Sequence, residues 1–213
     1  MVKIYALIVL KKNNNNLQNK LKHPVILSGC IDGWNTWLSW FYKSHITEFA
    51  EFISKILTEQ TPTRTRTKIS QDQYMCYIYV KNNISVVLIC DNEYPSRVAF
   101  DCLTKTMNYV DALTYSLINE IEDSGKDYQL NSHFCERVKQ LYEQYQEPAQ
   151  VDKIIKVKQD IDETKLIIHR TIDQVLERGQ KLDDLIQQTD MLSDESKKFY
   201  EVARKNNSCC NIL

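Results

Sequence analysis

Residues 162–190 read DETKLIIHRTIDQVLERGQKLDDLIQQTD and form the centre of a long heptad pattern. Alternating steps of three and four residues lead outward from Arg178 through positions that are mostly apolar or small. This spacing averages about 3.5 residues per turn, so the side chains form one narrow seam, which is typical of a left-handed coiled coil. The seam comprises Ile154, Val157, Ile161, Thr164, Ile168, Thr171, Val175, Arg178, Leu182, Leu185, Thr189, Leu192, Ser196, Phe199, Ala203 and Asn206.

Arg178 interrupts the apolar character of the seam at its centre. A guanidinium group stays protonated and is costly to bury without partners. If Arg178 faces the interior of a helical bundle, partner helices must therefore supply hydrogen-bond acceptors, and the residue then fixes register and partner choice. The alternative is a surface arginine beside an ordinary coiled coil.

This run resembles the R-SNARE motif of synaptobrevin-like proteins. The resemblance implies that Arg178 is the arginine of the central ionic layer and that the seam residues from Ile154 to Ala203 are hydrophobic layers of a bundle. It also implies three partners, the Q-SNARE helices, each of which presents a glutamine to the arginine. The resulting parallel four-helix bundle would zipper toward the membrane.

The first 140 residues predict a separate α+β domain with helices packed on an antiparallel sheet. Strands are expected within residues 2–10 and 23–34 and as two strands within 73–90. Apolar residues at helical spacing predict helices over 35–59, over about 98–113 and over 133–146. The alternating run TRTRTK, residues 63–68, is typical of an exposed strand edge.

This part of the chain resembles a longin (profilin-like) domain, most plainly at DNEYPSRVAF, residues 91–100. The resemblance implies an antiparallel five-stranded sheet flanked by three helices, with the fifth strand inferred. The expected order is therefore a longin domain over 1–140, a linker over 141–149, a long heptad-repeat SNARE helix over 150–208 and a lipidated tail over 209–213. Longin domains of this family fold back on their own SNARE motif through a surface that includes the first helix, where Phe49 and Phe52 match; for Phe52 the alternative is a plain core aromatic.

The chain ends in CCNIL. Cys210 with Asn211, Ile212 and Leu213 fits the C-a-a-X prenylation signal, although Asn211 is not aliphatic. One lipid gives only marginal membrane binding, so Cys209 is expected to carry a second, palmitoyl-type lipid. A terminal leucine favours geranylgeranyl, whereas the terminal methionine usual in prenylated longin R-SNAREs favours farnesyl, so the prenyl type stays open. The modifying partners would be a prenyltransferase and an acyltransferase.

Several function classes are not supported by the sequence. A net charge of -1 and a pI near 6.4 give no basic surface for nucleic acid. The four histidines show no metal-ligand spacing, and neither a phosphate-binding glycine loop nor a G-x-S-x-G motif occurs. We therefore expect no enzyme activity, no cofactor and no metal. No apolar run is long enough for a transmembrane helix.

Together these features predict an R-SNARE that zippers with three Q-SNARE helices and drives fusion of vesicle and target membranes, while its longin domain folds back as an autoinhibitory module. The resemblance implies that such a protein cycles between the cytosol and the cytoplasmic face of Golgi, endoplasmic reticulum and endosomal or vacuolar membranes. Phosphorylation of the layer residues Thr189 or Ser196 would place negative charge in the seam and oppose zippering. The alternative function is a longin coiled-coil tether or trafficking adaptor that drives no fusion.

Overall fold

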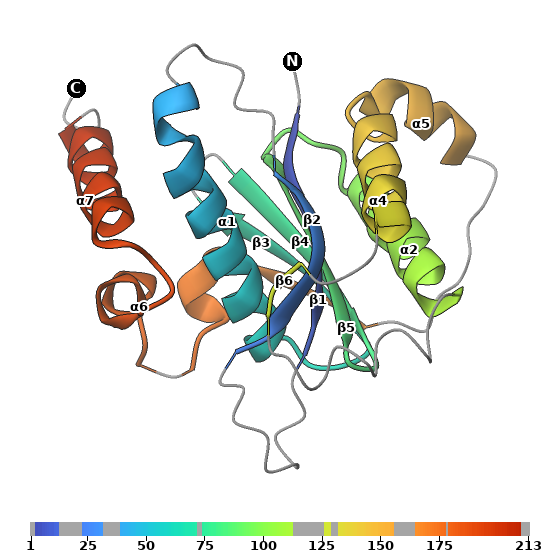
Figure 1. Ribbon diagram of the computed structural model, residues 1–213. Coiled ribbons are helices and arrows are strands. Elements are labelled where there is room, and N and C mark those ends of the chain that lie inside the picture. Colours follow the sequence, from blue (N-terminus) through green and yellow to red (C-terminus); the bar gives the residue numbers. More distant parts are fainter. Residues whose placement is uncertain are drawn as a thin grey trace.

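The computed structural model describes residues 3–12, 23–31, 39–71, 74–112, 126–128, 132–155, 165–177 and 179–209, and within them the side chains except at 39–42, 153–155 and 205–209. A mixed sheet lies between two layers of helices (Figure 1). Its strands are β1 (Ile4–Lys11), β2 (Val25–Ile31), β3 (Thr65–Gln71), β4 (Tyr74–Lys81), β5 (Ile84–Asp91) and β6 (Lys165–His169). Their order in space is β2-β1-β5-β4-β3-β6.

The first five strands pair antiparallel, and two-residue connections join β3 to β4 and β4 to β5. The β4–β5 hairpin turns at Asn82, whose φ of 52° lies in the left-handed region that asparagine tolerates better than most residues. β6 differs, since it comes from far along the chain and pairs parallel with β3 from Thr65↔Lys165 to Ile69↔His169. The outermost strand of the sheet is therefore contributed by the heptad segment.

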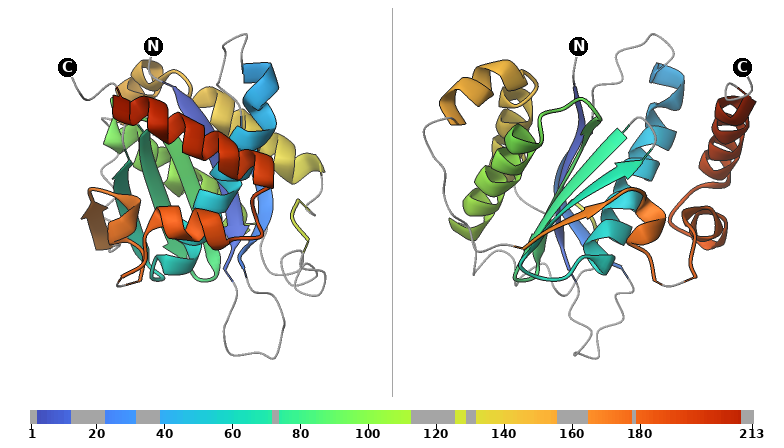
Figure 2. Two further views of the ribbon diagram at one scale, coloured as in Figure 1. Left: turned by 90° about the vertical axis from the view of Figure 1, so that its left-hand side faces the viewer. Right: turned by 180° about the vertical axis from the view of Figure 1, so that it is seen from behind.

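The sheet has a hydrophobic core on each face because alternate residues of its strands point in opposite directions. In β1, Leu7 and Val9 point to one face, and Ala6, Ile8 and Leu10 point to the other. The first face is covered by α2 (Ser96–Ala112), α4 (Ser132–Gln144) and α5 (Pro148–Ile155). The second is covered by α1 (Ser39–Gln60), followed outward by the end of the chain (Figure 2).

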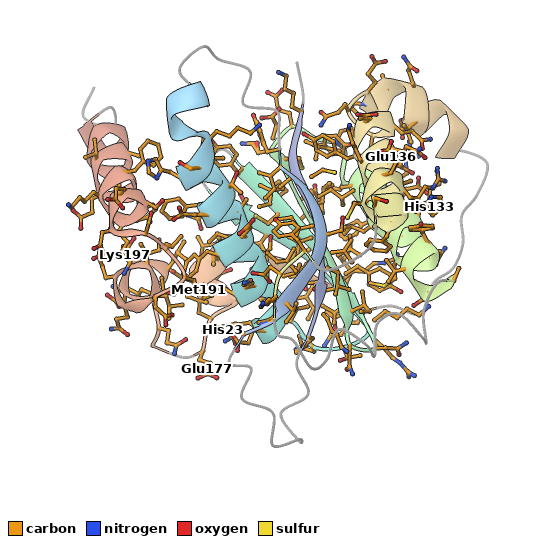
Figure 3. The ribbon with its side chains drawn as sticks, in the orientation of Figure 1. His23, His133, Glu136, Glu177, Met191 and Lys197 are labelled. Atoms are coloured by element: carbon orange, nitrogen blue, oxygen red, sulfur yellow. The ribbon has the colours of Figure 1, made fainter. Side chains whose placement is uncertain are left out.

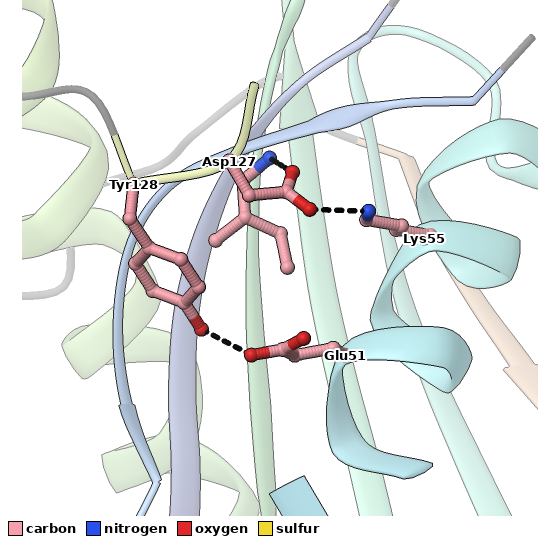
Figure 4. A network of polar contacts seen from close by, with 5 residues as sticks. Glu51, Lys55, Asp127 and Tyr128 are labelled. Carbon is pink, nitrogen blue, oxygen red and sulfur yellow. Dashed lines mark hydrogen bonds and ion pairs between the residues drawn. The ribbon is translucent and has the colours of Figure 1, made fainter. Parts of the chain in front are cut away.

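The free edge of β2 is covered by a short segment that includes Asp127 and Tyr128 (Figure 4). Asp127 Oδ1 accepts a hydrogen bond from the backbone N–H of Ile26 at 2.8 Å, and the Ile26 carbonyl accepts one from Tyr128 N–H at 2.7 Å. The same segment is tied to α1, since Lys55 Nζ lies 2.7 Å from Asp127 Oδ2 and the Tyr128 hydroxyl donates to Glu51. Exposed strand edges invite pairing with other chains, and this segment prevents it at β2.

The predicted α+β architecture is confirmed, including the strands expected at 2–10, 23–34 and 73–90. The inferred fifth strand is β3, which begins at Thr65 within the TRTRTK run. The expected linker, residues 141–149, holds the end of α4 and the first turn of α5. Pro148 begins α5. Proline is tolerated there because the N–H groups of the first helical turn make no hydrogen bond within the helix, so the N–H that proline lacks is not needed. The buried Val151 that follows packs in the first core.

The core contains two tyrosines whose hydroxyls have opposite surroundings. The Tyr94 hydroxyl donates a 2.7 Å hydrogen bond to the buried carbonyl of Tyr145. The Tyr109 hydroxyl is also buried, but no described residue bonds to it. An unsatisfied buried polar group costs about 1–3 kcal/mol.

We therefore expect the same substitution to have opposite effects at the two sites. Tyr94→Phe should lower the free energy of unfolding by about 1–2 kcal/mol, because it leaves the Tyr145 carbonyl without its donor. Tyr109→Phe should leave stability unchanged or raise it. Urea unfolding followed by tryptophan fluorescence measures both, and an equal loss of stability in the two variants would contradict this account of the core.

Candidate functional site

The heptad segment lies against the second face of the sheet and against α1 instead of forming one long helix. After β6 it forms the 3₁₀ turn η1 (Ile172–Gln174), α6 (Leu182–Gln188) and α7 (Asp194–Cys209). The continuous helix expected over 150–208 is thus absent in this conformation, at least over the described residues 165–177 and 179–209. The physical reason is that a helix with one narrow apolar seam is marginally stable alone, and the domain offers an apolar face on which a broken segment buries more.

The middle of the heptad segment packs in the hydrophobic core on the second face of the sheet, here called the second core. Ile172, Leu176, Leu182 and Ile186 are each at most 8% exposed and join the cluster that contains Phe52. Side-chain acceptors from neighbouring elements hold the backbone at two turns. Gln71 Oε1 accepts from Ile172 N–H at 3.1 Å, and Asp173 Oδ1 accepts from Leu182 N–H, the first residue of α6, at 2.8 Å.

Two aromatic contacts join α7 to α1. The ring of Phe49 lies 5.5 Å from that of Tyr200, and the His45 ring stacks on Phe199 at 5.6 Å between centroids. Phe49 is half-buried and packs against the second core, in which Phe52 is buried. The two phenylalanines singled out in the sequence therefore lie where α1 meets the heptad segment. Figure 3 labels Met191 and Lys197, which mark the turn before α7 and its first turns.

A polar cluster lies at the start of α7, opposite α1. Glu48 Oε2 accepts hydrogen bonds from the backbone N–H and the hydroxyl of Ser193, at 2.9 and 2.8 Å. Ser196 is fully buried, and its hydroxyl oxygen lies 2.8 Å from His45 Nδ1 and 3.0 Å from that of Ser193. The hydroxyl and the backbone N–H of this layer residue both have partners, so burial of its side chain costs little.

The pKa of Glu48 reflects this geometry. Partial burial by itself raises the pKa, but the hydrogen bonds from Ser193 and Ser196 and the nearby His45 together lower it below its ordinary value. A carboxyl with a lowered pKa stabilises the folded form above its unfolded pKa, and that contribution is lost as the pH falls through the folded pKa. The carboxylate also faces the N-terminus of α7, where the helix dipole favours negative charge.

The layer residues are covered unevenly. Leu182, Leu192 and Ser196 are buried, whereas Ile168 and Thr171 are exposed. Five further layer residues are partly buried, namely Val175, Leu185, Thr189, Phe199 and Ala203. Positions outside the described residues or side chains are Ile154, Val157, Ile161, Thr164, Arg178 and Asn206, together with the lipidation candidates Cys209 and Cys210.

Sequence reasoning missed two sets of residues in this site. The buried Ile172, Leu176 and Ile186 lie off the seam, and such apolar residues beside a complete heptad series are a signal of a second binding surface. The second set comprises the polar contacts of His45, Glu48 and Ser193. No pattern in the sequence could have paired His45 with Ser196 or Glu48 with Ser193, since the partners lie 151 and 145 residues apart in the chain.

The described residues show no candidate metal site. No group of histidine, cysteine, aspartate and glutamate side chains among them is arranged to hold an ion. Cys76 and Cys102 are buried, and burial raises the pKa of each thiol to about 12, which makes them poor nucleophiles. None of the described helices is both long enough and apolar enough to cross a bilayer.

Comparisons with known proteins agree with the two-part organisation. Residues 38–110 match the longin family, described as a regulated-SNARE-like domain, and residues 153–210 match the synaptobrevin family. The VAMP-like protein YKT61 of Arabidopsis thaliana is 34% identical over 213 residues, which cover 100% of both chains. The synaptobrevin homolog ykt6 of Schizosaccharomyces pombe is 39% identical over 82% of this chain and 85% of its own. The chain therefore belongs to the longin-type R-SNAREs, the synaptobrevin-like family of vesicle trafficking that includes these YKT6 proteins.

Proposed function

We propose that this R-SNARE zippers with three Q-SNARE helices to drive membrane fusion, and that the docked conformation is its autoinhibited state. The burial of Leu182, Leu192 and Ser196 against the longin domain carries the second part of the proposal. A side chain buried in the second core is not available to a four-helix bundle. Docking and zippering of this half of the segment are therefore mutually exclusive.

The lipid anchor completes the proposed mechanism. The C-a-a-X cysteine, Cys210, lies four residues after the last layer position, Asn206. A prenyl group on Cys210 and a second lipid on Cys209 would attach the end of the bundle to the cytoplasmic face of a membrane. Zippering toward the C-terminus would then pull that membrane toward the partner helices.

Ile186 separates docking from zippering, because it is fully buried in the docked state but lies off the seam. Ile186→Asp should open the chain, since truncation of a buried isoleucine alone costs about 2–5 kcal/mol and a buried carboxylate adds to this. We expect the bundle to close over the layers after Arg178 at least tenfold faster once partner helices are bound, and we expect faster amide exchange in α6. Hydrogen–deuterium exchange measures the second effect, and the rate at which a fluorescent label on α7 enters the bundle measures the first.

Val202→Asp is the matched control, because Val202 lies in the same segment, off the seam and 57% exposed. It should change the rate of bundle closing by less than twofold. Autoinhibition by docking is wrong if Ile186→Asp opens the segment but the bundle closes no faster.

Arg178 distinguishes a fusion bundle from the alternative tether. Residues 150–208 used as bait on detergent-solubilised membranes of the source cell should retain three heptad-bearing proteins with a glutamine at the matching layer. Arg178→Leu should lower the thermal stability of that complex, because the three glutamines lose their charged donor. Lys181→Leu, at an exposed off-seam position, is the control and should not. A single retained partner, or equal effects of the two substitutions, would favour a tether.

The tail generates a separate prediction. Cys210→Ser should abolish flotation of the expressed protein with membranes, because no lipid would then be attached by prenylation. Cys209→Ser should leave a weak and reversible association, since one lipid chain binds only marginally. Mass spectrometry of the C-terminal peptide identifies the prenyl group, and an unmodified Cys210 on membrane-bound protein would refute the assignment.

A further inference from the structure

The docked conformation protects the described layer residues before and after Arg178 very differently. After Arg178, the layer residues Leu192 and Ser196 are 4% and 0% exposed. Before Val175, both layer residues whose side chains the structure describes are exposed, and Ile168 reaches 66%. Among the described layer residues, the longin domain therefore covers several after Arg178 and leaves Ile168 and Thr171 uncovered.

β6 presents its exposed apolar side chains on one face. The parallel register places Leu166 beside Arg66 and Ile168 beside Lys68, and residues two apart in a strand share a face. Leu166 is 52% exposed, so two large exposed hydrophobic residues lie together on a five-residue strand. β6 is also the last strand of the sheet, and within the described ranges no other strand pairs with its outer edge.

The contacts that hold β6 differ in kind from those that hold α6 and α7. β6 is attached through backbone pairing with β3, while the side chains of Leu166 and Ile168 stay largely in water. α6 and α7 are held by the buried side chains of Leu182, Ile186 and Leu192. Because burial of large apolar side chains supplies about 1.5–3 kcal/mol each, β6 can be released at a smaller loss of buried surface than α6 and α7.

The place of Ile168 in the heptad seam indicates what kind of partner can bind here. Ile168 is a seam position, so a partner helix with apolar residues at heptad spacing can contact it without first displacing a side chain from the core. Leu166 lies beside it but off the seam, so it gains no such contact in a helical bundle. The surface thus suits heptad-bearing helices, and the off-seam neighbour provides an internal comparison.

We propose that partner helices capture the chain in its docked state at residues 165–171, while α7 still lies on α1. This inference rests on the proposed zippering function and adds its order of events. β6 leaves β3 first and joins the partners as a helix, and the advancing bundle then releases α6 and α7. The longin domain accordingly restrains the half of zippering that draws membranes together, and it leaves partner capture open.

A cross-link between α1 and α7 tests this order. Phe49→Cys with Tyr200→Cys places two thiols where the rings now lie 5.5 Å apart, and neither residue belongs to the seam. A short bismaleimide joins them in the full chain, with Cys209 and Cys210 changed to serine. The probe is the three-helix complex reassembled from the proteins that the 150–208 bait retains. The locked chain should bind it at a rate within fivefold of the same variant before cross-linking.

A second cross-link, which holds β6 on β3, tests the opposite prediction. Thr67→Cys with Ile167→Cys joins register neighbours of β3 and β6, and this cross-link should reduce capture more than tenfold. In the α1–α7 locked chain, Ile168→Gln should reduce capture at least fivefold, whereas Leu166→Gln should change it less than twofold. Both side chains are exposed, so neither change disturbs docking.

The outcomes separate the two proposals. If the chain binds before cross-linking but loses more than fivefold in the α1–α7 lock, or if the β6 lock leaves capture intact, the order of events is overturned and the fusion function stands. If the chain without a cross-link fails to bind the three helices, the proposed function itself fails, and this inference fails with it.

Discussion

A side chain can be buried against only one surface at a time, and the organisation of this molecule depends on that constraint. Leu182, Leu192 and Ser196 belong to the heptad seam, yet all three are buried against the longin domain. The seam alone is too narrow to stabilise an isolated helix, so the segment needs a partner surface in every state it adopts. The second face of the sheet, with α1, supplies that surface inside the chain. We propose that three partner helices supply it during fusion.

The polar contacts make the docked state specific as well as stable. A serine in an otherwise apolar seam would be costly to bury against an apolar wall, but His45 and Ser193 satisfy the Ser196 hydroxyl. Glu48 fixes the start of α7 through Ser193. These contacts set the position of α7 on α1, which apolar packing alone would leave free to slide. Docking therefore has a defined register, as zippering does.

The sequence predicted the domain fold well, because its strands and helices follow simple periodicities and its turns use residues such as Asn82. It also pointed to Phe49 and Phe52, which lie under the docked segment. It did not predict β6. The residues LIIH form a strand here because they pair with the edge of β3, and that pairing depends on the tertiary fold. Nor did it predict the break into η1, α6 and α7, since heptad spacing describes the bundle and carries no information about the docked form. Local patterns predict local structure, whereas contacts such as His45 with Ser196 depend on the tertiary fold.

The central claim is that the full chain rests with its heptad segment docked on α1 and the sheet. Spin labels at Lys43 on α1 and Val202 on α7, both exposed positions, report this directly in pulsed electron resonance. The docked chain predicts one narrow population at short distance. A segment of about 55 residues that is undocked would be free to extend toward about 80 Å when helical, and would give a broad distribution at long distances. A broad distribution as the main population, in the full chain without partners, would contradict the account.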